Sequence, residues 1–142
     1  MFIYKLTSDN GGAPCVHRGL LSLAICKPMI RRGAEVGDII FGIGGKCMGE
    51  RLLYIAVVAD KIGRGDYYRR AEYRHRPDSI YRWDGSRFII RTTARYHADG
   101  RSIGRDLGTH TLSQRLRASQ PGFPVLWPQG IDPIQKALAH PS

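Results

Sequence analysis

Three positively charged residues share a short connector between two segments, residues 20–26 and 38–43, that are both apolar enough to form buried strands. They are Lys27, Arg31 and Arg32. Pro28 suits the first turn of a helix because its missing N–H loses no bond there, and Gly33 can end such a turn. Lys27 precedes a proline and is expected to be extended. Free backbone N–H groups beside three cations favour an anion such as phosphate, with a solvated basic loop as the alternative.

A thiol and an imidazole also stand close together in the sequence. Cys15 and His17 are two residues apart, so they share a face if they lie on a strand. With Asp9 they form a candidate set for nucleophilic catalysis. Zinc takes about four ligands at familiar spacings, and because no CxxC or HxxxH pair occurs we expect no metal and no other cofactor. His97 and Asp99 form a second candidate acid–base pair, although a loop histidine is usually solvated.

Residues 66–76, DYYRRAEYRHR, interleave aromatic and basic side chains. Asp66 can cap a short helix, on which Tyr67, Arg70 and Arg74 would share one face. Aromatic rings stack on unpaired bases and arginines hold phosphates, so this composition is typical of nucleic-acid contacts. The alternative is a solvated basic helix that rests on the protein by its tyrosines.

The secondary-structure elements that position these residues can be predicted from apolar runs bounded by turn residues. Strands are expected at residues 2–6, 20–26, 39–43, 52–61 and 88–93. Short helices are expected at residues 28–32, 66–76 and 109–119, the last with Leu112 and Leu116 facing inward. Strands mixed with short helices predict an α+β fold.

The end of the chain continues this pattern. Residues 123–127 suit an edge strand, because Pro124 is tolerated only at an edge. Residues 128–142 are expected to be a short terminal helix and a frayed tail. At 142 residues the chain, 1–142, is expected to be a single domain.

The charge balance points to a polyanionic partner. Twenty-two Lys and Arg face 12 Asp and Glu, which gives a formal net charge of +10 and a pI near 10.0. Such a balance favours nucleic acid or a nucleotide. Most of the cations are arginines, whose planar fork matches phosphates and base edges.

Other features of the sequence favour a cytoplasmic protein with no membrane partner. The longest apolar run, residues 52–59, is far shorter than the roughly 20 residues of a spanning helix. The first ten residues lack the apolar core of a signal peptide. The 3 cysteines are widely spaced and odd in number, which does not suit a disulfide framework.

Three segments together resemble a known family of bacterial and phage proteins. They are YKLTSDNGGAPCV, GLLSLAICKPMIRRGAEVGDIIFGIGG and GERLLYIAVVADKI followed by DYYRR. They are similar to the nucleotide modification associated domain, second type, over the first half of the chain. The resemblance implies a role connected with modified DNA bases and phage conflict.

The expected order of strands is also similar, at the level of the fold, to the pseudouridine-synthase-and-archaeosine-transglycosylase-like (PUA-like) barrels, which include the EVE and ASCH groups. This second resemblance implies a small mixed β-barrel with short peripheral helices. It also implies recognition of RNA or of a modified base.

The leading interpretation is a domain that binds nucleic acid or a nucleotide and recognises a base. Its pocket would lie between the loop 9–14, the turn 27–32 and an aromatic ring, Tyr81 or Trp83. In this pocket the cations of the turn hold phosphate, the ring stacks on the base, and Asp9 or Asn10 reads the polar edge of the base. Arg70 and Arg74 add contacts to the nucleic acid.

The second interpretation is an enzyme acting on a nucleotide or a modified base. Its reactive set would be Cys15, His17 and Asp9. The sequence holds no glycine-loop NTPase motif and no zinc-deaminase motif, so neither chemistry is favoured.

Overall fold

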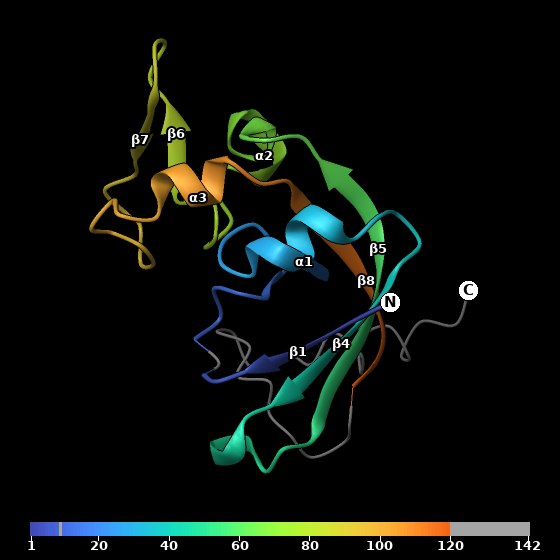
Figure 1. The fold of residues 1–142 in the computed structure, drawn as a ribbon. Coiled ribbons are helices and arrows are strands. Elements are labelled where there is room, and N and C mark those ends of the chain that lie inside the picture. Colours follow the sequence, from blue (N-terminus) through green and yellow to red (C-terminus); the bar gives the residue numbers. More distant parts are fainter. Residues whose placement is uncertain (9, 120–142) are drawn as a thin grey trace.

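A curved six-stranded sheet forms the frame of the protein (Figure 1). The structure is a computed structural model that describes residues 1–8 and 10–119. The strands lie in the order β1-β4-β5-β8-β3-β2 across the sheet. Their bounds are β1 (Phe2–Leu6), β2 (Cys15–His17), β3 (Leu20–Leu23), β4 (Ile39–Gly44), β5 (Leu52–Ile62) and β8 (Thr111–Ser119).

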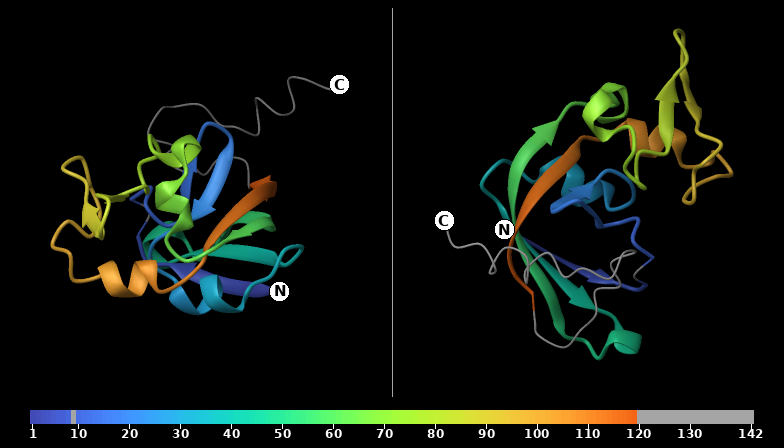
Figure 2. Two further views of the ribbon diagram at one scale, coloured as in Figure 1. Left: turned by 90° about the horizontal axis from the view of Figure 1, so that it is seen from above. Right: turned by 180° about the vertical axis from the view of Figure 1, so that it is seen from behind.

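The pairing of the strands explains the curvature. β1 and β4 are parallel, while the other neighbours in this sheet are antiparallel. The register between β5 and β8 shifts twice, between Ile55 and Ala56 and again between Val58 and Asp60. Such irregularities bend a strand and increase its twist. The long central strands β5 and β8 are therefore curved, and the sheet as a whole is bent rather than flat (Figure 2).

The small mixed β-barrel that the PUA-like resemblance implies is not found as a closed barrel within residues 1–8 and 10–119. β1 and β2 stand at opposite ends of the strand order, and no ladder joins them among residues 1–8 and 10–119. Helix α1 (Pro28–Gly33) packs Ile30 into the core of the sheet. This part of the chain is therefore an α+β fold with an open sheet, and the likeness to PUA-like barrels stays a prediction.

The segment expected to be a helix at residues 109–119 is mostly strand β8, so that prediction is wrong. Leu112 faces inward as expected, but from the middle of the sheet, where β8 pairs with both β5 and β3. Thr111, Ser113 and Gln114 are buried beside it. The spacing of the leucines favoured a helix, but hydrogen bonding to a strand on each side makes this segment a strand. Local propensity contains no information about such pairing with distant strands.

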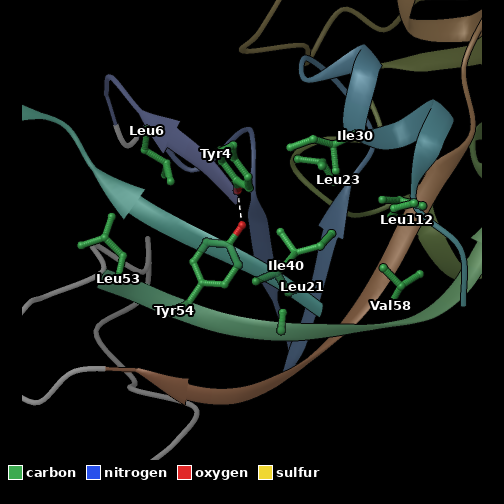
Figure 3. Packing of buried hydrophobic residues seen from close by; sticks show 12 residues of the cluster. Tyr4, Leu6, Leu21, Leu23, Ile30, Ile40, Leu53, Tyr54, Val58 and Leu112 are labelled. Carbon is green, nitrogen blue, oxygen red and sulfur yellow. Dashed lines mark hydrogen bonds between the residues drawn. The ribbon is translucent and has the colours of Figure 1, made fainter. Parts of the chain in front are cut away.

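The main core lies between the sheet and α1 (Figure 3). The hydroxyl groups of Tyr4 and Tyr54 are hydrogen-bonded to each other inside it. Gly42 permits this arrangement, because a Cβ at that position would overlap the Tyr54 ring. The cluster consists of Tyr4, Leu6, Leu21, Leu23, Ile30, Ala34, Ile40, Leu53, Tyr54, Ala56, Val58 and Leu112.

Short elements carry the remaining side chains of interest. They are the 3-10 turns η1 (Lys46–Met48) and η2 (Ala71–Tyr73), the helices α2 (Asp66–Arg69) and α3 (Ile103–Leu107), and the hairpin of β6 (Tyr81–Trp83) and β7 (Phe88–Ile90). Beneath them lies a second core of Ala24, Ile25, Ile62, Tyr67, Tyr68, Ile80 and Tyr81. The β6–β7 hairpin projects away from the sheet (Figure 1).

Some of the elements predicted from the sequence can be compared with the structure, and others lie outside the described residues. Asp66 begins α2, although the capping position is Gly65 and no side chain caps the helix. None of the helices in the described part of the chain is long and apolar enough to cross a membrane. Asp9, the edge strand at residues 123–127 and the terminal helix and tail at 128–142 lie outside the described residues.

Candidate functional site

Arg31, the central cation of the predicted anion site, lies inside the protein. Its side chain is 0% exposed and forms an ion pair with Asp106. Its Nε donates to the carbonyl oxygen of His110 at 2.8 Å, and Nη2 donates to that of Asp106 at 2.6 Å. Burial lowers the pKa of the guanidinium, and the nearby carboxylate acts in the opposite direction. Arg31 therefore joins α1 to the segment before β8 and does not present its guanidinium at the surface.

The other two cations of the connector are more open. Arg32 is exposed, and its carbonyl oxygen accepts a hydrogen bond from Lys61. Lys27 donates to the carbonyl oxygen of Lys5 at 3.2 Å and lies 5.1 Å from the centroid of the Tyr4 ring. Lys27 is left-handed, with φ 42° and ψ 48°, so the expectation of an extended residue is wrong. The helical turn itself is confirmed, and anion binding there stays a prediction.

The two aromatic candidates for base stacking differ sharply. Tyr81 is 0% exposed, and its hydroxyl donates to Oδ2 of Asp106 at 2.8 Å. Trp83 is 41% exposed. Only Trp83 of this pair presents a ring that a base could reach.

Of the candidate set Cys15, His17 and Asp9, the structure describes only Cys15 and His17, and Cys15 is enclosed. Cys15 is 1% exposed, and burial raises the pKa of its thiol to about 12, with a further contribution from Asp78. The guanidinium of Arg76 binds the carbonyl oxygens of both Cys15 and His17. The reason is the register of the β2–β3 hairpin, which turns Cys15 inward.

A buried polar network explains why Cys15 is enclosed. Asp78 accepts hydrogen bonds from Oγ of Ser22 at 2.5 Å and from the hydroxyl of Tyr67 at 2.7 Å. Arg76 lies 3.4 Å from the same carboxylate and donates to Ser22 at 2.6 Å. The network ties β3 to the segment after α2, which is a structural role.

A different cysteine meets a histidine and a carboxylate. Sγ of Cys26 lies 3.4 Å from Nε2 of His97, and Nδ1 of His97 lies 2.5 Å from Oδ2 of Asp106. Cys26 follows β3 in the turn to α1, His97 lies in the loop between β7 and α3, and Asp106 belongs to α3. We call these three residues the thiol array. Cys26 is partly exposed, the His97 side chain is 20% exposed and Asp106 is fully buried.

The loop of His97 is held by residues 10–14, which include Gly11 and Gly12 and which we call the glycine-rich loop. The hydroxyl of Tyr96 donates to the carbonyl oxygen of Asn10 at 2.8 Å. The Tyr96 ring lies against Gly12, where a Cβ would come within 3.0 Å of it. A glycine at position 12 therefore permits the approach that sets His97 beside Cys26.

Sequence proximity identified His97 but gave it the wrong carboxylate. Asp99 is exposed and lies 3.4 Å from Nε of Arg101 instead. Cys26 and Asp106 carried no local signal, because nothing in their neighbourhood in the sequence shows that the fold brings them to His97. A search for cysteine, histidine and carboxylate at any separation would have included them among many other combinations.

The electrostatics of Cys26 keep its thiol protonated. Burial raises the pKa of the thiol, and the Asp106 carboxylate raises it further, while Arg105, Lys27 and Arg31 act in the opposite direction. Such a thiol needs a base before it can act as a nucleophile. Within the residues that the structure describes, no group of three or more His, Cys, Asp and Glu could hold a metal ion.

A second arrangement lies on and beside the β6–β7 hairpin. The guanidinium carbon of Arg69 is 4.4 Å from the centroid of the Trp83 ring and 5.1 Å from that of Phe88. The two rings meet edge to face, with centroids 5.1 Å apart. Arg69 and Phe88 thus hold an exposed tryptophan in one orientation.

Three arginines lie on or next to the hairpin in the chain: Arg82 in β6, Arg91 directly after β7 and Arg74 after η2. Nε of Arg91 donates to the carbonyl oxygen of Tyr81, the residue before Arg82, at 3.0 Å. Burial lowers the pKa of Arg91, and the positive charges of Arg74 and Arg82 lower it further. Arg74 and Arg82 are exposed. Arg70, by contrast, lies 3.9 Å from the carboxylates of Asp60 and Glu72. We call Arg69, Arg74, Arg82, Trp83, Phe88 and Arg91 the hairpin surface.

Comparison with known protein families gave a match over most of the chain. The family model described as nucleotide modification associated domain 2 matches residues 1–109. That span includes all three residues of the thiol array and the whole hairpin surface. Neither the curated proteins nor the solved structures gave a significant match.

Proposed function

This chain belongs to the nucleotide modification associated domain 2 family, and from that premise we propose that it binds nucleic acid through the hairpin surface. The family description links the chain to nucleotide modification. The resemblance noted from the sequence connects such domains with modified DNA bases and phage conflict, which makes DNA the first partner to test.

The observation that carries the proposal is the arginine cluster. None of the ion pairs within residues 1–8 and 10–119 involves Arg74, Arg82 or Arg91, and the Arg91 guanidinium donates instead to the carbonyl oxygen of Tyr81. Like charges held together repel one another in the free protein. Phosphate groups would relieve that repulsion, and the planar guanidinium fork fits them in pairs of hydrogen bonds.

Trp83 is the residue of the hairpin surface that could recognise a base. Phosphate contacts position a protein on nucleic acid but carry no information about the base. A partly exposed indole, braced by Arg69, offers a flat surface on which an unpaired base can stack. The proposal therefore assigns the backbone to the arginines and the recognised base, unpaired or flipped from the duplex, to Trp83.

The test is the affinity for fluorescein-labelled single-stranded and duplex DNA, measured by fluorescence anisotropy at several salt concentrations. Arg82→Gln removes one charge from the hairpin surface. Lys46→Gln removes one exposed charge from η1, at the other end of the molecule from the hairpin (Figures 1 and 2). We expect Arg82→Gln to weaken binding by about 1.5–3 kcal/mol, and Lys46→Gln to have little effect.

The salt dependence separates specific contacts from general attraction. Each phosphate contact contributes a slope of about −0.9 to log K against log salt on duplex DNA. The slope for Arg82→Gln should therefore be shallower by about one contact. Equal losses for both variants would mean that only net charge matters, and absence of binding at low salt would remove nucleic acid as the partner.

A further inference from the structure

We propose that Cys26 is a catalytic nucleophile that accepts an acyl group from an amide or a thioester, with His97 as its base and Asp106 as the residue that positions the base. This activity is separate from nucleic-acid binding by the hairpin surface, and it does not use Cys15 or His17.

The order of contacts is the first argument. Nδ1 of His97 donates to the carboxylate of Asp106 at 2.5 Å, which leaves the lone pair on Nε2. That nitrogen faces Sγ of Cys26 at 3.4 Å. A nucleophile, a base and a group that orients the base therefore stand in sequence, which is the arrangement that activates a side chain for acyl transfer.

The support around Asp106 is the second argument. The Asp106 side chain is 0% exposed, Tyr81 donates to its Oδ2 at 2.8 Å, and Arg31 lies 3.7 Å from its Oδ1. Tyr81 and Arg31 would be enough to keep a structural carboxylate in place. Asp106 also bonds to His97, which is partly exposed and lies next to the thiol of Cys26, so the carboxylate is linked to the thiol through the imidazole.

The position of Cys26 is the third argument. Cys26 has φ 56° and His97 has φ 48°, a region that residues other than glycine seldom adopt. Such conformations persist where the surrounding structure holds them. Burial and Asp106 raise the pKa of the Cys26 thiol, so the proton stays on sulfur until His97 removes it.

The reaction balances without any further reagent. As Sγ bonds to the carbonyl carbon of the donor, its proton passes to Nε2 of His97. The bond from that carbon to nitrogen or sulfur then breaks, and the proton on Nε2 goes to the leaving amine or thiol. A thioester remains on Cys26. Water or an amine attacks it, gives a proton to His97, and takes the acyl group as Sγ recovers a proton. No electrons are gained or lost overall.

The place for the donor follows from the neighbours of the thiol. Ala13, Cys26 and Tyr96 are partly buried and all pack against the second core, and Tyr96 also bonds to Asn10 of the glycine-rich loop. An acyl group with a small apolar part suits these neighbours. Lys27 and Arg105 are cations near the thiol, which favours a donor with negative charge.

The test uses the chain of residues 1–142 and p-nitrophenyl acetate, an activated ester that stands in for the natural acyl donor: the bond that breaks is carbon–oxygen, and p-nitrophenolate is the leaving group. Release of p-nitrophenolate is followed by absorbance, and the acetylated residue is identified by peptide mass spectrometry. We expect acetyl groups on Cys26, and a rate on the order of a hundredfold lower in His97→Ala. Cys26→Ala should lose the acetylated peptide. Cys47→Ala, which removes an exposed cysteine outside the array, should behave as the parent protein.

The role of Asp106 in orienting His97 has to be tested by a property that would not change if Asp106 only stabilised the fold. Asp106→Asn keeps the size of the side chain but favours the wrong proton position on His97. If the variant folds, its rate of acetylation should fall and the dependence of that rate on pH should shift. If it does not fold, His97→Gln, at a partly exposed position, gives the same information about the base.

The two proposals can fail separately. Cys26→Ala should keep its affinity for DNA, and Arg82→Gln should keep its rate of acetylation. The thiol proposal is overturned if acetylation of Cys26 is as fast in His97→Ala as in the parent, or if Cys47 is acetylated and Cys26 is not.

Discussion

The guanidinium of Arg31 and the carboxylate of Asp106 form a fully enclosed ion pair, with Nη1 3.7 Å from Oδ1 and both side chains 0% exposed. Arg31 also donates to the backbone carbonyl of Asp106 at 2.6 Å. A buried charge is tolerated only while it is paired and hydrogen-bonded. This pair therefore links α1 to α3, and it holds Asp106 in the place where His97 meets it.

Replacing Arg31 should destabilise the protein rather than merely weaken a surface contact. Arg31→Ala leaves Asp106 buried without its cation, and we expect the free energy of unfolding to fall by about 3–5 kcal/mol. Arg32→Ala, one residue further on an exposed side of α1, should change it by no more than about 0.5 kcal/mol. Urea unfolding followed by circular dichroism measures both. Equal stability of the two variants would contradict the role assigned to Arg31.

The helical turn that carries these arginines could be predicted, but the direction of each side chain could not. Pro28 and Gly33 mark the turn by local chemistry, and α1 spans these two residues. Which of the two arginines enters the core depends on where Asp106 and His110 lie, and those residues are 75 and 79 positions from Arg31. No local pattern contains that information, because the contact is created only by the tertiary fold.

The same limit explains the thiol array. The loop position of His97 was visible in the sequence, and so was its potential for acid–base chemistry. Its partners Cys26 and Asp106 come from the turn between β3 and α1 and from α3. Both contacts depend on how the β7–α3 loop packs against the glycine-rich loop. The sequence offered Asp99 instead, because distance along the chain was the only measure of proximity.

The choice between the two carboxylates can be tested directly. Asp99→Asn should leave the acetylation rate of Cys26 unchanged, because Asp99 is exposed and pairs with Arg101. It should also leave the free energy of unfolding within about 0.5 kcal/mol of the parent. The measurement is the p-nitrophenyl acetate assay with a parallel urea titration. If Asp99→Asn lowers the acetylation rate of Cys26, then Asp99 and not Asp106 is the residue that orients His97.

The buried Cys15 makes a prediction about alkaline stability. Burial, with the Asp78 carboxylate, raises the pKa of this thiol from its ordinary value of 9.0 to about 12. In the unfolded chain the thiol ionises at the lower pH, so its contribution to stability is complete below pH 9.0 and is lost as the pH rises to about 12. The loss should approach about 1.4 kcal/mol per pH unit in that range.

Cys15→Ala isolates this contribution from that of the buried tyrosines. Tyr67, Tyr68 and Tyr81 also have raised pKa values because they are buried, so the parent loses stability at high pH for several reasons. Cys15→Ala should lose stability less steeply between pH 9.0 and about 12, whereas Cys47→Ala should follow the parent. Urea midpoints across this range decide it, and identical slopes for all three proteins would show that Cys15 is not enclosed.

Trp83 and the hairpin arginines should make different kinds of contribution to nucleic-acid binding. Stacking of a base on an indole is worth about 1–3 kcal/mol and releases no counterions. Trp83→Ala should therefore weaken binding of single-stranded DNA by about that amount while leaving the slope of log K against log salt unchanged. Trp83→Phe, which keeps an aromatic face, should recover part of the affinity.

Comparing this variant with Arg82→Gln separates the two physical terms. Arg82→Gln should change the salt slope as well as the affinity, on duplex and on single-stranded DNA alike. Trp83→Ala should matter most where bases are unpaired, because the ring cannot stack on a base inside the duplex unless that base is flipped. Both quantities come from the same anisotropy titrations. If Trp83→Ala binds single-stranded DNA as tightly as the parent, the exposed indole has no part in recognition and only the arginine contacts of the hairpin surface remain.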